Sequence, residues 1–190
     1  RALTALGEAS RLRKARPEGD RSGLTRLMAS PAEPVQVAAL RLAGEWKDSS
    51  AFLNTIVTLA GAPGTPPAAR TAAFGALRSL AGPGTQDALV KLAASGDASI
   101  RRQAAAGLAA LDLGTAVPSL VALASGPMTE ADALEFWRAV LPVKGAAKAL
   151  AGALPGSGLD PGTARVGMRV AREGGRSDLD LVVALARGAG

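Results

Sequence analysis

The stretch "IRRQAAAGLAAL" (residues 100–111) places two arginines at the head of an alanine-rich run. Ala104, Leu108 and Leu111 follow Arg101 at offsets of three, seven and ten residues. These offsets return to one face of a helix that has about 3.6 residues per turn. The stretch is therefore predicted to be an amphipathic helix that buries this face.

The same pattern occurs in three further places along the chain. "VQVAALRLAGEW" (35–46) and "ARTAAFGALRSL" (69–80) superpose on the first stretch when Gln36 and Arg70 take the place of Arg101. A fourth, weaker copy starts at Ala133, and the successive spacings of 34, 31 and 32 residues are typical of helical arrays. The equivalent apolar slots are Ala39, Ala43 and Trp46; Ala73, Leu77 and Leu80; and Phe136, Val140 and Val143.

Each of these helices follows a shorter apolar segment that is predicted to be its helical partner. Capping oxygens and first-turn prolines support the division into helices. No strand pattern with a period of two residues occurs. The predicted partner segments are 24–29, 52–60, 87–94 and 117–124, and the predicted helix starts are marked by Thr65, Asp97, Thr129 with Asp132, and Asp160.

The predicted fold is all-α. It is a right-handed α-solenoid of antiparallel helix pairs with about ten or eleven helices, in which each pair needs its neighbours to bury its apolar face. The chain is predicted to be a single repeat domain over residues 1–190. Its approximate units are a leading helix at 1–21 and repeats at 22–48, 49–82, 83–114, 115–143 and 144–190. Because the chain opens on Arg1 inside an apparent helix, we expect it to be a piece of a longer protein.

The repeated pattern resembles HEAT repeats. It has an arginine at the head of the second helix, an alanine three positions later and a leucine seven positions later. The resemblance covers most of the chain and is clearest over residues 86–111. It implies that the second helices of the pairs line the concave side of the array. It specifies the fold and says little about the function.

The composition argues against an enzyme. The chain has no Cys and no His, which removes thiolate metal sites, disulfides, cysteine nucleophiles and the usual general base. No pair of carboxylates recurs at catalytic spacing, and "GPGT" (82–85) lacks the lysine and the preceding strand of a phosphate loop. No catalytic, cofactor-binding or metal-binding residue is therefore predicted. No apolar run reaches the roughly 18 to 20 residues that a membrane span requires.

The formal net charge of +6 raises the question of nucleic-acid binding. Residues 1–30 carry seven basic and three acidic side chains, whereas residues 31–100 carry five of each. The excess is thus concentrated in one cluster, which is either a solvated helix end or a docking patch for an acidic partner or another domain. The members of this possible docking patch are Arg11, Arg13, Lys14 and Arg16.

A groove that follows phosphates needs Lys or Arg on the same exposed helix positions in successive repeats. The outward positions of the four copies, at offsets one, two, five and nine, do not form such a ladder. We therefore predict no specific nucleic-acid binding, a local structural role for Arg70 and Arg101, and no partner that depends on Arg102. Phe136 and Trp137 are predicted to pack in the core. The charged outward residues are Arg41, Arg102, Arg138, Glu45 and Glu135.

Several longer phrases give a second resemblance. They resemble the HEAT-repeat middle region of large multidomain proteins of planctomycetes and their relatives, in which a propeller of membrane-bound dehydrogenase type precedes the repeats and a c-type cytochrome follows. This resemblance implies an exported, periplasmic or extracytoplasmic redox protein. In such a protein this segment would be a non-catalytic scaffold that binds proteins or spaces neighbouring domains of the same chain. The haem attachment pattern is absent here. The alternative is a nucleic-acid-binding solenoid that resembles the alkylpurine DNA glycosylases. The phrases lie at 8–20, 40–47, 109–116 and 164–185.

Overall fold

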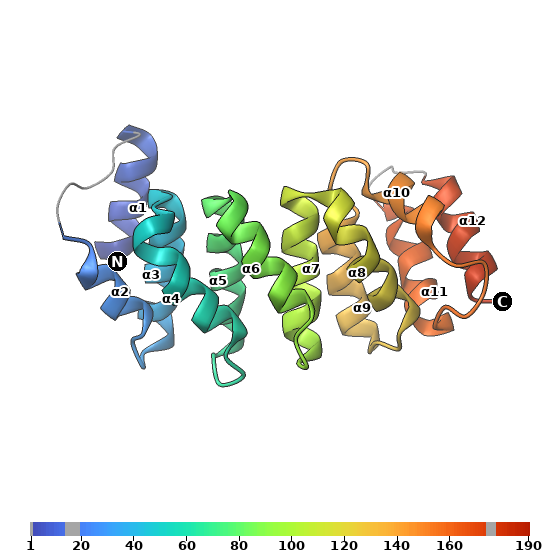
Figure 1. The fold of residues 1–190 in the computed structure, drawn as a ribbon, viewed down its shortest axis with the longest axis horizontal. Coiled ribbons are helices and arrows are strands. Elements are labelled where there is room, and N and C mark those ends of the chain that lie inside the picture. Colours follow the sequence, from blue (N-terminus) through green and yellow to red (C-terminus); the bar gives the residue numbers. More distant parts are fainter. Residues whose placement is uncertain (1, 14–19, 174–177) are drawn as a thin grey trace. The chain divides into compact units, whose positions relative to one another are not determined.

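A computed structural model describes residues 2–13, 20–173 and 178–190 of the chain (Figure 1). All regular structure in these residues is helical, which confirms the predicted all-α fold class. The twelve helices of the described residues slightly exceed the ten or eleven expected. They are α1 (Ala2–Arg13), α2 (Ser22–Met28), α3 (Glu33–Trp46), α4 (Ser49–Gly61), α5 (Pro67–Leu80), α6 (Pro83–Ala93), α7 (Ala98–Leu111), α8 (Leu113–Ser125), α9 (Glu130–Val140), α10 (Ala146–Ala153), α11 (Pro161–Val170) and α12 (Leu179–Gly188).

The chain divides into two compact units, Arg1–Ile100 and Arg101–Gly190, and the division falls within α7. In the N-terminal unit, α3 packs against α1, α2 and α5, and α4 packs against α5. In the C-terminal unit, α9 packs against α11, α8 against α10, and α12 against both α10 and α11. Each unit is thus built from helices that bury their apolar faces against the neighbours of the same unit.

Burial follows the predicted repeat register. The slots at offsets zero, three and seven are buried in all four copies, except that Arg101 is half-buried. The slot at offset ten lies in or just beyond the last turn, and it is buried only where Trp46 fills it. The predicted core face is therefore confirmed. Its buried members are Gln36, Ala39, Ala43, Arg70, Ala73, Leu77, Ala104, Leu108, Ala133, Phe136 and Val140.

The structure adds a fifth copy of the pattern, in α11. Ala164, Gly167 and Ala171 are buried at the same offsets, and Ala164 lies 31 residues after Ala133. This copy was not predicted from the sequence, and its three slots hold only small residues. The small residues permit a close approach, since a Cβ atom added to Gly167 would lie 2.7 Å from Cε2 of Trp137.

Most of the predicted helix starts are correct. Asp97, Thr129 and Asp160 each accept a hydrogen bond from the backbone N–H three residues on, as an N-cap side chain does. The prediction for Thr65 is wrong. Its side chain is buried, and α5 begins at Pro67 after an extended Pro66 that makes no side-chain capping bond. Asp48 and Asp112 are caps that the sequence analysis did not single out.

Candidate interaction surface

Several of the predicted outward positions on the second helices carry exposed charged side chains. Of the predicted outward positions, Arg41, Glu45, Glu135 and Arg138 are exposed and Arg102 is half-buried. Two predicted outward alanines, Ala72 and Ala106, are instead buried. An alanine side chain is small enough to be covered by its neighbours at close helix packing, so these two positions belong to the core rather than to the surface.

Arg70 has the local role predicted for it. Its side chain is buried, with a residue exposure of 7%, and Nη2 donates hydrogen bonds to the carbonyl oxygens of Ala62 (3.1 Å) and Pro63 (3.0 Å). These two carbonyls belong to the loop that joins α4 to α5. A charge-assisted hydrogen bond is stronger than a neutral one, so Arg70 fixes the path of this loop and does not present a charge to a ligand. The role predicted for Arg101 stays a prediction.

The predicted docking patch is only partly within the described residues. Arg11 is exposed on α1, and Arg13 is the last residue of that helix. The side chain of Arg13 and all of Lys14 and Arg16 lie outside the described residues. Arg11 and Arg41 line one recess of about 470 Å³ between α1 and α3, together with Glu8 and Glu45. The assignment of the patch as a docking site stays a prediction.

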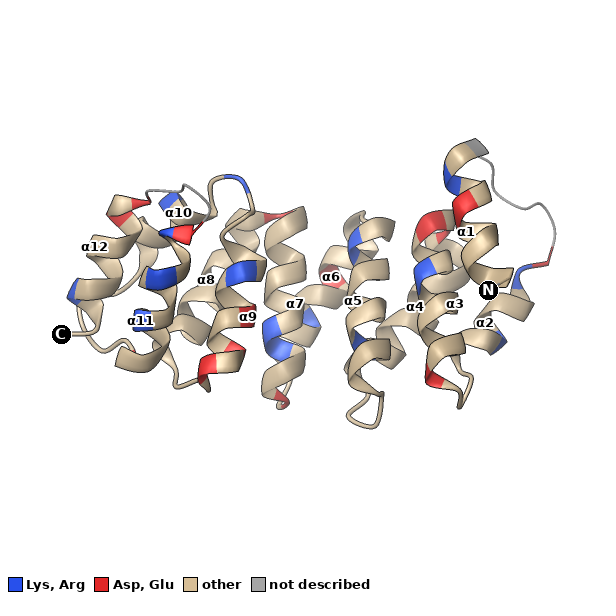
Figure 2. Cartoon of the chain, turned by 180° about the vertical axis from the view of Figure 1, so that it is seen from behind, with Lys and Arg blue, Asp and Glu red and all other residues tan. Residues whose placement is uncertain are grey.

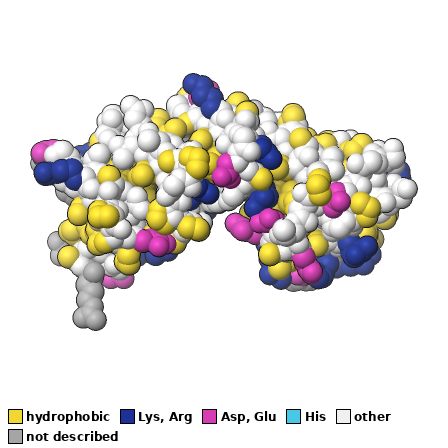
Figure 3. Space-filling view, turned by 90° about the horizontal axis from the view of Figure 1, so that it is seen from below, with side chains coloured by type: hydrophobic (Ala, Val, Ile, Leu, Met, Phe, Trp, Pro, Cys, Tyr) yellow, Lys and Arg dark blue, Asp and Glu magenta, His cyan; other side chains and the backbone are white. Residues whose placement is uncertain are grey.

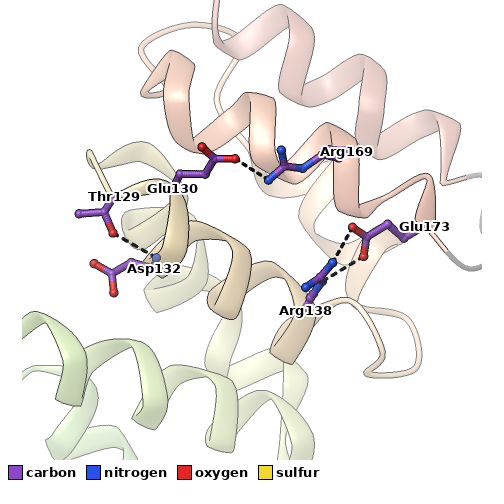
Figure 4. A network of polar contacts seen from close by, with 6 residues as sticks. All are labelled: Thr129, Glu130, Asp132, Arg138, Arg169 and Glu173. Atoms are coloured by element: carbon purple, nitrogen blue, oxygen red, sulfur yellow. Dashed lines mark hydrogen bonds and ion pairs between the residues drawn. The ribbon is translucent and has the colours of Figure 1, made fainter.

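A network of ion pairs connects α9 to α11 and to Glu173, three residues beyond the end of α11 (Figure 4). Arg138 donates two hydrogen bonds to Glu173, from Nε to Oε2 (3.0 Å) and from Nη2 to Oε1 (2.9 Å). This pairing raises the pKa of Arg138 above its ordinary value, first through the hydrogen bond and then through the negative charge of Glu173. Arg169 donates to Glu130 at 2.9 Å. Ion pairs thus connect the polar face of α9 to α11 and to Glu173.

Arg102 also has a partner, which corrects the expectation that nothing depends on it. Its Nη2 donates to Oδ1 of Asp132 at 2.5 Å, so the pair links α7 to the first turn of α9. The partners are 30 residues apart in sequence and meet only because the helices stack. Because both side chains are partly exposed, the pair stabilises the fold by at most about 1 kcal/mol.

Three arginines gather on α11 and just after it. Arg165 and Arg169 are four residues apart, which places them on one face of the helix, and Arg172 lies in the turn two residues beyond its end. We call these three residues the α11 arginine strip. Figure 2 shows basic segments along α11, and Figure 3 shows basic and acidic side chains side by side in the C-terminal unit, at the right of the view.

A recess lies beside the strip, between the start of α9 and α11. Its volume is about 330 Å³. Arg165 and Arg169 line it together with the carboxylate-bearing Glu130 and the apolar side chains of Met128 and Val166. This recess was not predicted, because α11 was not recognised as a further copy of the repeat and its outward residues were not compared with those of the four other copies.

Aromatic side chains do not contribute to this surface. Phe136 and Trp137 are buried, which confirms their predicted packing role, and Nε1 of Trp137 donates to the carbonyl oxygen of Thr163 at 3.0 Å. Across the described residues, no three acidic side chains gather closely enough to hold a metal ion. In the same residues, every helix is too short or too polar to cross a lipid bilayer.

The repeat register and its burial agree with a comparison against known families. Residues 22–110 match the family model of HEAT repeats. The HEAT segment takes in α2 to α6 and all but the last residue of α7. The buried slots of α9 and α11 continue the HEAT pattern beyond it. No curated protein and no solved structure matches the chain significantly.

Acidic residues that cap helices make the fold sensitive to low pH. Hydrogen bonds from Thr163, first from its backbone and then from its side chain, hold the pKa of Asp160 below its ordinary value of 3.8. A folded-state pKa below the unfolded value stabilises the fold above the unfolded pKa, and this contribution is lost as the pH falls through the folded pKa. We therefore expect the melting temperature to fall with acidification below about pH 4.

The variant Asp160→Asn tests this expectation, because asparagine keeps an oxygen acceptor for the cap but cannot ionise. Its melting temperature should depend less on pH in the acid range than that of the unaltered chain. Thermal unfolding followed by circular dichroism at a series of pH values measures the difference. The exposed Asp87, which caps no helix, provides the control as Asp87→Asn. Equal acid sensitivity of Asp160→Asn and the unaltered chain would contradict the assignment.

Proposed function

We propose that the chain is a non-catalytic scaffold or protein-interaction module that holds or spaces other domains. The observation that carries the proposal is the HEAT pattern itself, in which repeated helix pairs bury one face and leave polar positions of the second helices exposed. A repeat array presents such positions at regular intervals, which suits it to contact an extended partner surface. The ion pairs that connect α9 and α11 support this role, because they hold exposed charges in fixed places.

Exposed apolar side chains on the first and last helices support the spacer role. Leu6 and Leu12 on α1, and Leu179 and Val183 on α12, are large apolar residues that are exposed to solvent. We propose that they pack against neighbouring parts of a longer chain. A longer chain that includes adjoining sequence should then melt at a higher temperature than residues 1–190 under the same conditions. An unchanged melting temperature would contradict the spacer role.

We further propose that the longer protein is an exported redox protein of the dehydrogenase and cytochrome type. The resemblance of several phrases to the middle region of such proteins supports this context. The test is the absorption spectrum of the full-length protein purified from its source, in which a c-type haem gives a characteristic reduced band. A full-length protein without haem would count against this context and would leave the scaffold role open.

The competing function, nucleic-acid binding of the DNA glycosylase type, predicts a different result. Two of the exposed arginines on α9 and α11 pair with carboxylates on the same surface, and the aromatic residues that could stack on bases are buried. We therefore expect binding of labelled single- and double-stranded DNA to be weak at low salt and negligible at physiological salt. Fluorescence anisotropy measures it. Sub-micromolar binding at physiological salt would favour the nucleic-acid alternative.

A direct test of the module compares two sets of charge reversals in the full-length protein. Arg138→Glu and Arg165→Glu alter the exposed surface of α9 and α11, whereas Lys91→Glu alters α6, a first helix of a pair. Chemical cross-linking followed by mass spectrometry reports which domains or subunits this segment contacts. The first set should remove cross-links that the second retains. The proposal fails if neither set changes them and the segment cross-links to nothing outside itself.

A further inference from the structure

The α11 arginine strip holds more positive charge than its surroundings neutralise. Arg165 and Arg169 are about one helical turn apart on α11, and Arg172 lies two residues beyond the end of the helix. Arg165 and Arg172 are exposed, and the structure gives neither an ion-pair partner among the described residues. Arg169 is paired with Glu130, but the two side chains are 51% and 71% exposed. An ion pair this exposed contributes little free energy, so a competing carboxylate can replace it.

The recess beside the strip offers apolar contact at the same place. Met128 and Val166 line it, and Gly162 contributes no side chain to fill it. The surface therefore combines two guanidinium groups that have no ion-pair partner within the described part of the chain with an apolar recess that Arg165 lines. A guanidinium binds a carboxylate through two parallel hydrogen bonds, and a pocket of this kind accepts an aliphatic side chain.

We propose that the α11 arginine strip and its recess bind an acidic segment of a partner protein. Carboxylates of the segment pair with Arg165 and Arg172, and an apolar side chain of the segment enters the recess against Met128 and Val166. The inference rests on the proposed interaction function and names the chemistry of one partner. Charge complementarity gives such a contact both its specificity and its rate of association.

A protein segment fits this surface better than a nucleic acid does. Glu130 lies in the recess, and Glu173 follows α11, so a continuous row of phosphates would meet carboxylates as well as arginines. A peptide can alternate carboxylates with neutral side chains. Its carboxylates can then face the arginines of the surface while its neutral side chains face Glu130 and Glu173. A nucleic acid would also gain no stacking, because Phe136 and Trp137 are buried.

The experiment uses a fluorescein-labelled peptide of repeated Glu-Glu-Leu and measures its binding to the chain by anisotropy. A Gln-Gln-Leu peptide of the same length and a single-stranded DNA of thymidines are the comparison probes. Arg165→Glu combined with Arg172→Glu should weaken binding of the acidic peptide about tenfold or more. Glu130→Gln should strengthen it about two- to fivefold, because it frees Arg169.

The matched control is Arg26→Glu combined with Arg78→Glu, which makes the same change of net charge on exposed positions of the N-terminal unit. It should change the affinity by less than about twofold at physiological salt. Equal losses in the two double variants would overturn the inference, since net charge alone would then explain binding. It would also be overturned by equal binding of the Gln-Gln-Leu peptide, or by tighter binding of the DNA.

The increase in affinity expected for Glu130→Gln is an internal control. A variant that had unfolded would bind the peptide more weakly, so tighter binding cannot result from unfolding. Failure of this inference is distinguishable from failure of the proposed function. If the acidic peptide does not bind but the full-length protein still shows cross-links that depend on Arg138, the interaction role stands and the acidic partner is wrong. Loss of both would remove the interaction role as well.

Discussion

Replacing Trp137 with alanine is expected to lower the free energy of unfolding by about 3 to 5 kcal/mol. The side chain is fully buried, at 0% exposure, and its ring meets that of Phe136 edge-on with the centroids 5.0 Å apart. Its Nε1 hydrogen bond to the carbonyl oxygen of Thr163 joins α9 to the first turn of α11. The substitution therefore creates a cavity and removes a buried hydrogen bond between α9 and α11. Denaturant titration followed by circular dichroism measures the loss.

Two further variants show which contact is responsible. Trp137→Phe keeps an aromatic ring but has no N–H donor, so its cost should lie between that of the unaltered chain and that of Trp137→Ala. Gly167→Ala adds a Cβ atom 2.7 Å from Cε2 of Trp137 and should destabilise the unaltered chain by about 1 to 3 kcal/mol. In the Trp137→Ala background the same change should cost much less, because the ring that it meets is gone. Equal costs in the two backgrounds would contradict the packing of α9 on α11.

The helical register was predictable because it depends on local sequence. Offsets of three, seven and ten residues fix one helix face whatever lies beyond it, so the burial of Ala104 and Leu108 followed from the pattern alone. The fifth copy was not predictable in the same way. A side chain larger than glycine at position 167 would meet Trp137 of α9 and Leu185 of α12. The fit between a glycine on one helix and large side chains on other helices cannot be recognised from the sequence of any one of these helices alone.

The α11 arginine strip could not be predicted from the sequence for a related reason. Residues 151–190 carry five basic and four acidic side chains, so a count along the chain finds almost no excess there. The structure separates these charges. The strip holds Arg165 and Arg169 on α11 and Arg172 just after it, whereas Asp160 caps that helix and Asp180 is in the first turn of α12. The positive surface therefore arises from the spatial sorting of charges that are mixed in sequence.

The partners of Arg102, Arg138 and Arg169 were unpredictable because they lie 30 to 39 residues from these arginines in the sequence. Ion pairs within one helix join residues three or four positions apart, and these pairs can be read directly from the sequence. Ion pairs between adjacent repeats can be recognised only when the stacking of the helices is known.

For Thr65, by contrast, a contact was predicted that the structure does not contain. The side chain has the right chemistry for a cap, but Pro66 follows it in extended conformation and the helix begins one residue too late for Thr65 to reach it.

The last expected result concerns the repeat register. Leu108→Ala should lower the free energy of unfolding by about 2 to 5 kcal/mol, because Leu108 is 1% exposed and its loss leaves a cavity in the core. The matched control is Leu179→Ala, in which the same atoms are removed from a side chain that is 66% exposed. That control should cost less than about 0.5 kcal/mol in the chain of residues 1–190.

The comparison separates the register from general hydrophobicity, because both variants remove the same atoms from leucines in helices of the C-terminal unit. A large cost for Leu108 and a small one for Leu179 requires that offset seven of α7 faces the core, as it does in the structure. Equal costs would show that the register is wrong. In a repeat array, stability is roughly a sum of unit and interface terms, so a defect at Leu108 weakens its own unit most. Amide hydrogen exchange should therefore lose more protection in residues 101–170 than in α3 and α4, whereas a uniform loss would mean that the two units unfold together.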